Sequence, residues 1–448
     1  SVTALVESFR QQGLKITPQR RFIFEALDGD HSHPTAEDVY QRVVSALPDV
    51  SRTTVYNTLG ELVTLGELVE IDLGEGKTRY DTNTGPHHHL ICANCHALVD
   101  LYECKLCYPK CPYIPPHDFM LDFPRLMLRA KAIYARKEGI SSKDKMLSNP
   151  DFIGKLGSTT APVSNWGNRT KAGRIVMEKT VGIHRDWPIP VYEGQPFSKW
   201  FASHQPKPGV GENGKVAFFT TCSVEYSELE TGIAAVQVLE HNGIKVVERY
   251  ETCCGMPALD VGDVDTATIN AQRNIAILAE AVKQGYDVVA PGPTCSYMLK
   301  EEYPLLVDSE EARLVAENTY DLGEYLSKKH REKKLNTEFS NPPGQIAYHM
   351  PCHLKAQNIG YKSRDLLKLT GAKAKLVDRC SAVDGTWGMT AEYHDLSLKW
   401  AGKLLEGMEK TQADVYASDC PLAALRILEG TGTKALHPVI LLRDAYGL

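Results

Sequence analysis

The chain contains 448 residues, which is longer than one ordinary hydrophobic core and predicts two to four domains. An apolar content of 43% and a net charge of −6 exclude a disordered or collagen-like chain, and the acidic balance gives no electrostatic indication of nucleic-acid binding. No apolar run reaches the roughly 18 residues that span a bilayer, and no signal-peptide pattern opens the sequence, so we expect a cytoplasmic protein without a membrane span.

Cysteine is the most informative residue type in the composition, with twelve copies. Structural disulfides are rare in the cytoplasm, so metal ligation or redox chemistry is the expected use of so many thiols. The alternative is that the cysteines are buried and act as small apolar residues.

Residues 1–83 show short helices followed by a β-hairpin. Three helices are predicted by residues suited to N-caps, namely Thr17, Thr35 and Ser51. Residues 68–72 and 78–81 have the pattern of two strands joined by a glycine-containing turn. This order predicts a winged helix-turn-helix domain, which makes DNA a candidate partner.

The third predicted helix has two different faces. Its apolar face carries Val55, Leu59, Leu62 and Leu65 at helical spacing. The opposite face carries the four residues expected to contact DNA, which are Arg52, Thr53, Tyr56 and Asn57. The alternative is that these four are ordinary solvated residues of an exposed helix.

Several short motifs stand out within the first hundred residues. They are Thr17-Pro18-Gln19-Arg20, His33-Pro34-Thr35-Ala36, Ser51-Arg52-Thr53-Thr54-Val55-Tyr56, Arg79-Tyr80-Asp81 and the His/Cys segment from His87 to Cys95. Together they resemble the ferric uptake regulator family, especially its peroxide-sensing branch, with residues 84–101 as a shortened metal-binding and dimerisation segment. The resemblance implies a homodimer as a possible assembly and a regulatory metal site formed by His33, Asp81, His87, His89 and Asp100.

This ligand set is chemically consistent with a transition metal. Three imidazoles and two carboxylates give a mixed nitrogen and oxygen site that suits iron, manganese or zinc ions. Side chains alternate along a strand, so His87 and His89 are expected on the same side. A surface run of histidines without a metal is the alternative interpretation.

Residues 102–206 begin with a cysteine-rich segment and continue as a helical or irregular connector. Cys104, Cys107 and Cys111 have a spacing that resembles a ferredoxin-like motif. A second interpretation joins Cys104 and Cys107 to Cys92 and Cys95 as a four-cysteine zinc or single-iron site. The two sites would compete for the same sulfurs, and the sequence leaves both open. A helix is predicted at residues 124–136, and residues 204–214 have the composition of a linker.

Residues 215–448 contain an internal repeat. We refer to residues 215–330 as the first cysteine unit and residues 340–448 as the second cysteine unit. In each, three predicted strands alternate with helices, which is typical of βαβ units and a mostly parallel sheet. All six strands lead into cysteine, namely Cys222, Cys253 with Cys254, and Cys295, then Cys352, Cys380 and Cys420. Ligands bind beyond the carboxyl ends of parallel strands, so we expect these thiols to hold metal.

The adjacent pair Cys253-Cys254 is too close for an ordinary disulfide but suits two bonds to neighbouring irons of one cluster. The pattern of Cys222, Cys253-Cys254-Gly255 and Cys295 resembles the CCG-domain family of iron–sulfur oxidoreductases. That family includes the cluster-binding subunits of heterodisulfide reductase and the iron–sulfur subunit of anaerobic glycerol-3-phosphate dehydrogenase. The resemblance implies an iron–sulfur cluster of the 4Fe-4S type and a redox partner protein or flavoprotein subunit.

The two cysteine units do not match this pattern equally. In the first unit, Gly292 stands where the family often has a further cysteine before Cys295. The second unit has Cys380-Ser381 in place of a double cysteine. The first unit therefore keeps four cysteines, enough for one cluster, whereas the second keeps three, with His349 and His353 as candidate substitutes.

The leading hypothesis is an iron–sulfur electron-transfer protein fused to a metal-responsive regulator domain. No catalytic residue is assigned, because electron transfer requires only a cluster of suitable potential. One alternative is a DNA-binding repressor that senses metal or redox state, with a sensory or degenerate CCG half. Another is an oxidoreductase subunit whose N-terminal segment is a remnant that binds metal but not DNA.

Overall fold

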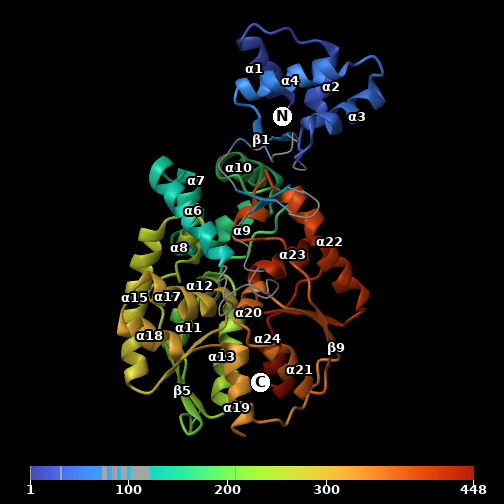
Figure 1. Cartoon of the computed structure of the whole chain (residues 1–448). Coiled ribbons are helices and arrows are strands. Elements are labelled where there is room, and N and C mark those ends of the chain that lie inside the picture. The colour runs from blue at the N-terminus through green and yellow to red at the C-terminus, as the bar shows by residue number, and fades with distance from the viewer. Residues whose placement is uncertain are drawn as a thin grey trace. The chain divides into compact units, whose positions relative to one another are not determined.

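The computed structural model describes residues 2–30, 33–72, 78–82, 84, 88–91, 98–101, 122–206 and 208–448, with the backbone alone for residues 4, 72, 88–91 and 98–101. The chain divides into two compact parts, Ser1–Tyr102 and Glu103–Leu448 (Figure 1). No helix among the described residues combines the length and the apolar character that crossing a membrane requires.

The N-terminal part consists of helices followed by two antiparallel hairpins. The helices are α1 (Val2–Gln11), α2 (Pro18–Leu27), α3 (Ala36–Ala46) and α4 (Arg52–Thr64). Strand β1 (Val69–Asp72) pairs with β2 (Thr78–Asp81), and β3 (His88–Ile91) pairs with β4 (Leu98–Leu101). The expected caps are present, because the side chains of Thr17, Thr35 and Ser51 each accept a backbone N–H of the helix that follows.

The core of this part joins all four helices. Phe9, Phe24, Val39 and Leu59 are fully buried and belong to one apolar cluster. On α4, the predicted apolar residues Val55, Leu59 and Leu62 are buried, whereas Arg52, Thr53, Tyr56 and Asn57 are exposed. The helical spacing in the sequence therefore identified the buried face of α4 correctly.

The connector is more regular than the sequence suggested. It forms helices α6 (Phe123–Glu138), α7 (Ser142–Leu147), α8 (Pro150–Thr159), α9 (Ala161–Arg169), α10 (Lys171–Val181) and α11 (Phe197–Ser203). Its Ser, Asn and Thr residues cap these helices: Ser141 begins α7, Asn149 begins α8 and Thr170 begins α10. Glycine allows close packing, since a Cβ at Gly154 would lie 2.3 Å from the Tyr226 ring. The polar residues and glycines of the connector therefore supply helix caps and helix contacts.

The first cysteine unit contains a four-stranded parallel sheet. Its strands are β5 (Gly214–Phe218), β6 (Ile244–Glu248), β7 (Asp287–Ala290) and β8 (Thr319–Asp321), in the order β6-β5-β7-β8. Its helices are α12 (Cys222–Tyr226), α13 (Leu229–His241), α14 (Met256–Asp260), α15 (Val264–Lys283), α16 (Pro293–Tyr297), α17 (Tyr303–Leu306), α18 (Glu310–Glu317) and α19 (Leu322–Arg331), with a π-helical turn at Met298–Glu302. The short strand β8 was not expected.

The second cysteine unit repeats this arrangement with three strands. Strands β9 (Gln345–His349), β10 (Lys373–Val377) and β11 (Val415–Ser418) are parallel and follow the order β10-β9-β11. Its helices are α20 (Cys352–Ala356), α21 (Lys362–Leu369), α22 (His394–Lys410), α23 (Pro421–Thr431) and α24 (Pro438–Tyr446), with a 3-10 turn at Trp387–Met389. In both units the first strand lies between the second and the third, which confirms the internal repeat at the level of topology.

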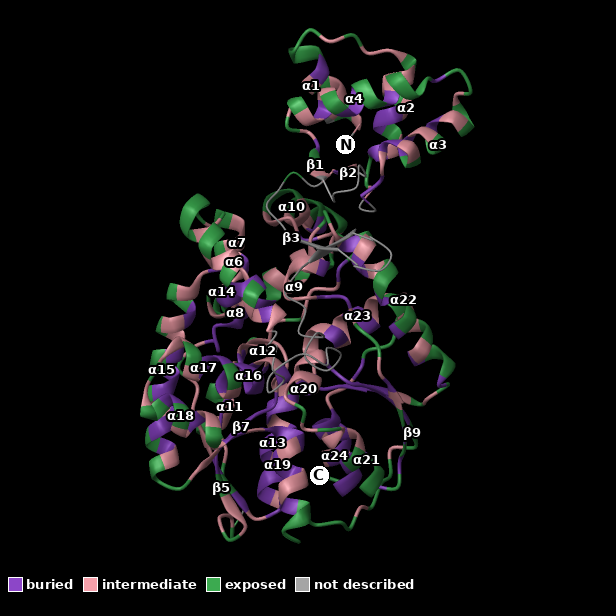
Figure 2. Cartoon of the chain, in the orientation of Figure 1, coloured by how far each residue is buried: buried purple, intermediate pink, exposed green. Residues whose placement is uncertain are grey.

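Both faces of the first sheet are buried. Val216 and Phe218 of β5 pack into one apolar cluster, whereas Ala217 and Phe219 pack into another on the opposite face. This alternation follows from the two-residue period of a strand. Figure 2 shows the consequence in α13, which is buried along most of its length. The sheet is therefore a rigid support for the loops at its carboxyl edge.

Candidate metal centres

The four cysteines of the first cysteine unit converge at the carboxyl edge of its sheet. Cys222 begins α12 just after β5, and Cys253-Cys254 follows β6. Cys295 lies in α16, just after β7. Since β5, β6 and β7 are adjacent parallel strands, their ends bring these residues together although they span 73 positions of sequence.

The four thiols lie in a continuous row, in which each interacts with the next. Cys222 interacts with Cys253, Cys253 with Cys254, and Cys254 with Cys295. The interaction with Cys253, followed by burial, raises the pKa of the Cys222 thiol well above its usual range. For Cys295 the interaction with Cys254 lowers the pKa, but burial outweighs it and the net pKa is raised. Without a metal, these thiols keep their protons. A metal ion or cluster that binds the sulfurs would displace these protons.

The residues on either side of the site have positive φ angles. Thr221, immediately before Cys222, has φ 71° and ψ 149°, a conformation that β-branched residues rarely adopt. Gly255, immediately after Cys254, has φ 92°, and a Cβ there would lie 3.2 Å from the Ala267 backbone. The sequence Cys-Cys-Gly therefore has a structural reason, because the chain after the double cysteine must turn close to α15.

A second layer of polar side chains fixes the double-cysteine segment. Asp151 of α8 accepts the Cys253 backbone N–H at 2.6 Å and the Thr252 hydroxyl at 2.9 Å. Asn274 of α15 is fully buried and donates to the Thr252 carbonyl at 3.0 Å. These contacts hold the loop from two different helices. Sequence reasoning missed both residues, since neither belongs to the cysteine pattern.

The donor set of the first cysteine unit fits an iron–sulfur cluster, since four thiolates are the usual ligands of such clusters. In a zinc site with Zn–S bonds of about 2.3 Å, the sulfurs would lie about 3.8 Å apart. Among the described residues, however, the one group of three ligand atoms mutually within 4.8 Å does not include cysteine. The sulfurs are spread more widely than a single ion requires.

The second cysteine unit places its cysteines at the same strand ends but not in the same environment. Cys380 is exposed, and its sulfur accepts the Ala382 backbone N–H at 3.2 Å. Burial raises the pKa of Cys420, and the backbone N–H groups of Ala423 and Leu422 oppose this shift. Cys352 is half-buried at the start of α20. The polar groups that interact with the sulfurs of Cys380 and Cys420 are thus backbone N–H groups, not other thiols.

The two histidines considered as substitutes have other contacts. His349 Nδ1 is 2.9 Å from Ser418 Oγ, and its Nε2 is 3.1 Å from the Arg379 carbonyl oxygen. Burial lowers the pKa of His349 to about 4, so the ring is neutral. Both of its nitrogens are engaged, which leaves neither for a metal. His353 Nδ1 lies 3.1 Å from the Thr294 hydroxyl, so its ring faces the first cysteine unit.

Two of the expected regulatory ligands meet in the N-terminal part. His33 and Asp81 are each about 1% exposed, and His33 Nε2 lies 3.6 Å from Asp81 Oδ1. His33 has φ 52°, a left-handed conformation, and Arg79 donates to its carbonyl at 2.8 Å. His89 and Asp100 are Cα partners in the β3–β4 hairpin. His87 lies outside the described residues.

Only some of the exposed residues of α4 are free to contact a DNA molecule. Arg52 makes two hydrogen bonds of 2.9 Å to Glu37 of α3 and lies 4.2 Å from the centre of the Tyr40 ring. Tyr56 is 52% exposed. A DNA contact by Arg52 would therefore compete with Glu37, whereas Tyr56 is accessible. The remaining expected metal ligands, Cys92, Cys95, Cys104, Cys107 and Cys111, lie outside the described residues.

His184, His394 and Asp395 form the group of ligand atoms within 4.8 Å noted above. The two imidazole rings are stacked, with centroids 3.8 Å apart and planes 9° apart. A metal lies in the plane of each imidazole that binds it, so one shared ion would require both rings to tilt. His394 already bonds to Glu429 at 2.5 Å and to Asp395 at 3.2 Å. The group is better explained as a polar contact between the connector and α22.

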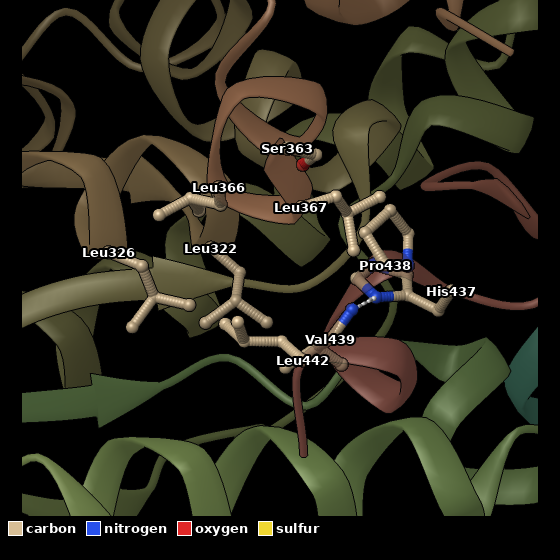
Figure 3. A pocket seen from close by; sticks show the side chains of 10 residues that line it. Leu322, Leu326, Ser363, Leu366, Leu367, His437, Pro438, Val439 and Leu442 are labelled. Carbon is tan, nitrogen blue, oxygen red and sulfur yellow. Dashed lines mark hydrogen bonds between the residues drawn. The ribbon is translucent and has the colours of Figure 1, made fainter. Parts of the chain in front are cut away.

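A small pocket lies between α19, α21 and α24 (Figure 3). Apolar side chains such as Leu322 and Leu366 form most of its wall, with Ser363 and His437 as polar members. Both ring nitrogens of His437 have partners, the Val439 N–H and the Pro291 carbonyl oxygen. No cysteine lines this pocket, so it is separate from the thiol cluster.

Comparison with protein-family models gives two matches. Residues 11–111 match the model described as "Ferric uptake regulator family". Residues 216–300 and 346–425 match the model described as "Cysteine-rich domain". The second match covers the strand-end cysteines of both cysteine units.

Similar proteins divide along the same boundary. Over 331 residues, 71% of this chain and 81% of the relative, the sequence is 28% identical to a subunit of the anaerobic glycerol-3-phosphate dehydrogenase of Escherichia coli (strain K12). Over 101 residues, 22% of this chain and 67% of the relative, it is 39% identical to the peroxide-responsive repressor PerR of Staphylococcus epidermidis. A solved zinc-bound manganese uptake regulator is 31% identical, covering 22% of this chain and 74% of that one, with a TM-score of 0.20.

Proposed function

Since the chain belongs to the ferric uptake regulator family in its N-terminal part and carries two cysteine-rich domains in its C-terminal part, we propose that it is an iron–sulfur electron-transfer protein joined to a metal-responsive regulator domain. The electron-transfer activity is the function that the geometry supports best. The similar protein of Escherichia coli is one subunit of a dehydrogenase, so a redox partner subunit is part of the proposal.

One observation carries this proposal: four thiols from three strand ends form one connected group in the first cysteine unit. Cys222, Cys253, Cys254 and Cys295 would hold the cluster, which supplies one-electron transfer when bound. The protein's own contribution is to hold these sulfurs in place and to exclude water. Cys253, Cys254 and Cys295 are at most 7% exposed. We propose weaker or no cluster binding by Cys352, Cys380 and Cys420.

Elemental analysis tests this function. The full-length chain, purified without oxygen, should contain iron and acid-labile sulfide in similar amounts. A Cys254→Ala variant should lose the iron and sulfide of the first cysteine unit and keep the N-terminal metal, because two of the row's three contacts involve Cys254. Wild-type protein with zinc or with no metal in the first cysteine unit would contradict the proposal.

A metal-responsive regulator is the second candidate function, and the buried His33–Asp81 pair favours it. We propose that these residues bind iron, manganese or zinc together with His87, His89 and Asp100. The order of α2 to α4 and the β1–β2 hairpin supports a winged helix, with Arg52, Thr53, Tyr56 and Asn57 directed to DNA. Cys92, Cys95, Cys104, Cys107 and Cys111 are proposed as a further zinc or iron–sulfur site.

A mobility-shift assay distinguishes the regulator from a remnant that binds metal but not DNA. The full-length chain would be titrated into a pool of randomised duplexes with and without Mn²⁺. A regulator shifts DNA in the presence of the ion, and both Asp81→Asn and Tyr56→Ala weaken the shift. Absence of a shift, together with Mn²⁺ binding that Asp81→Asn abolishes, would support the remnant.

A further inference from the structure

The carboxylate of Asp151 is placed directly behind the thiols of the first cysteine unit. It comes from α8 of the connector, about a hundred residues away in sequence and outside the matched cysteine-rich domains. Helix α8 is held against α12, the helix that Cys222 begins. Gly154 lies against the Tyr226 ring, and Ser158 donates to the Tyr226 carbonyl at 3.4 Å. The position of Asp151 is therefore built into the packing.

The carboxylate makes three hydrogen bonds, all to the segment that carries the double cysteine. Its Oδ2 accepts the Cys253 N–H at 2.6 Å and the Thr252 hydroxyl at 2.9 Å. Its Oδ1 accepts the Tyr250 hydroxyl at 2.5 Å. None of these three donors is a cation, so they solvate the negative charge of Asp151 without neutralising it.

The same charge would act on a cluster held by these sulfurs. Reduction adds one electron to the cluster, which makes it more negative, and a nearby fixed negative charge opposes this step. Hydrogen bonds to the sulfurs and local charge are known determinants of cluster potential. Asp151 affects both the local charge and the hydrogen bonds to sulfur. Its carboxylate accepts the Cys253 N–H, so this donor is not available to a sulfur.

We propose that Asp151 is a positioning residue that lowers the reduction potential of the cluster in the first cysteine unit. This inference rests on the proposed electron-transfer function. It makes the connector a part of the redox site, so that the site is complete only when α8 is packed against α12. Asp151 itself needs no contact with the iron, since it acts through its charge and through Cys253.

The test uses Asp151→Asn, which keeps the shape of the side chain and an oxygen acceptor but removes the charge. Asp308→Asn is the matched control, because Asp308 is a carboxylate of the same unit whose side chain is 88% exposed. Full-length proteins purified without oxygen would be assayed for iron and sulfide, and then titrated electrochemically with detection by electron paramagnetic resonance.

Asp151→Asn should keep its iron and sulfide and become at least about tenfold easier to reduce, which corresponds to a rise of about 59 mV for one electron. Asp308→Asn should leave the potential unchanged. Tyr250→Phe removes one donor to the carboxylate, exposes the cluster to more of its charge, and should shift the potential in the opposite direction to Asp151→Asn. A merely structural role would not produce shifts of opposite sign.

An unchanged potential in loaded Asp151→Asn protein would overturn the inference while leaving the electron-transfer function intact. If the Asp151→Asn protein does not bind the cluster, the Tyr250→Phe protein provides the test. A lowered reduction potential in Tyr250→Phe supports the inference, and an unchanged or raised potential overturns it. Wild-type protein without iron and sulfide would overturn the electron-transfer function and this inference together.

Discussion

The two cysteine units share a topology but differ in what surrounds their sulfurs. In the first, the thiols of Cys222, Cys253, Cys254 and Cys295 interact with one another in a row. In the second, Cys380 is exposed and bonds to its own loop. Placing a cysteine at the end of a parallel strand is therefore not sufficient to bring its sulfur into a row with the other thiols. The loop that follows the strand must also turn its sulfur toward the others.

The loops after the second strands show how this difference arises. The first unit has Cys253-Cys254-Gly255, with Gly255 at φ 92° and close to α15. The second has Cys380-Ser381-Ala382, with Ala382 at φ 53°. Both loops use a left-handed turn at the third position, but only the first has two sulfurs before it and a glycine that permits the close approach.

The largest expected difference between the units is in iron content. Cys254→Ala should remove essentially all iron and sulfide from the C-terminal part, because it takes away the sulfur that lies between those of Cys253 and Cys295 in the row. Cys380→Ala should leave both nearly unchanged. Iron and sulfide assays on the two purified variants give the comparison directly. Equal losses would show that the units share the cluster or bind one each.

A smaller effect, on the pH dependence of stability, is expected at Asp321, which ends β8 in the first unit. Burial, and then the nearby Asp419 of the second unit, raises the pKa of Asp321 to about 8. In the unfolded chain the group ionises near pH 4, so the stability gained from its protonated form is present at low pH and lost as pH rises toward 8. The loss should be roughly 1–3 kcal/mol.

Thermal unfolding of wild type and Asp321→Asn at about pH 5.5 and about pH 8.5 measures this effect. The melting temperature of the wild type should fall by several degrees more than that of the variant between the two values. Parallel falls in the two proteins would show that Asp321 is already ionised in the folded state.

The backbone strain at Thr221, just before Cys222, should lower the free energy of unfolding by a measurable amount. Thr221 has φ 71°, whereas the matching Pro351 before Cys352 has an ordinary φ of −66°. Thr221→Gly should raise the free energy of unfolding by about 1 kcal/mol, because glycine adopts this conformation without strain and the lost cap costs only a few tenths. Urea unfolding of both proteins checks the value. Destabilisation by Thr221→Gly would mean that the cap outweighs the strain.

The smallest effect is expected at Gly292, where the family resemblance suggested a further cysteine. Gly292 has an extended φ of −115°, and a Cβ there would meet just the Thr221 methyl group, at 3.5 Å. Gly292→Cys should therefore change stability by less than about 0.5 kcal/mol and leave the iron content unchanged or higher. A loss of iron in Gly292→Cys would show that the missing cysteine is excluded by the cluster geometry.

Much of the site could be predicted because its signals are local. Strand patterns ended at Cys222, Cys253 and Cys295, and parallel strands end at one edge, so convergence followed from sequence. Caps such as Ser51 likewise predicted the start of α4. Asp151 could not be predicted, because its role depends on how α8 packs against α12 through Gly154. The hydrogen bonds of His349 could not be predicted from the sequence either, since their partners Ser418 and Arg379 lie on a neighbouring strand and loop.

A crystal structure of the anaerobically purified chain, with anomalous data at the iron and zinc absorption edges, tests the cluster assignment most directly. We expect iron density within bonding distance of the sulfurs of Cys222, Cys253, Cys254 and Cys295, and none at Cys380. Zinc in place of iron at these four sulfurs, or iron at the second cysteine unit alone, would contradict this assignment.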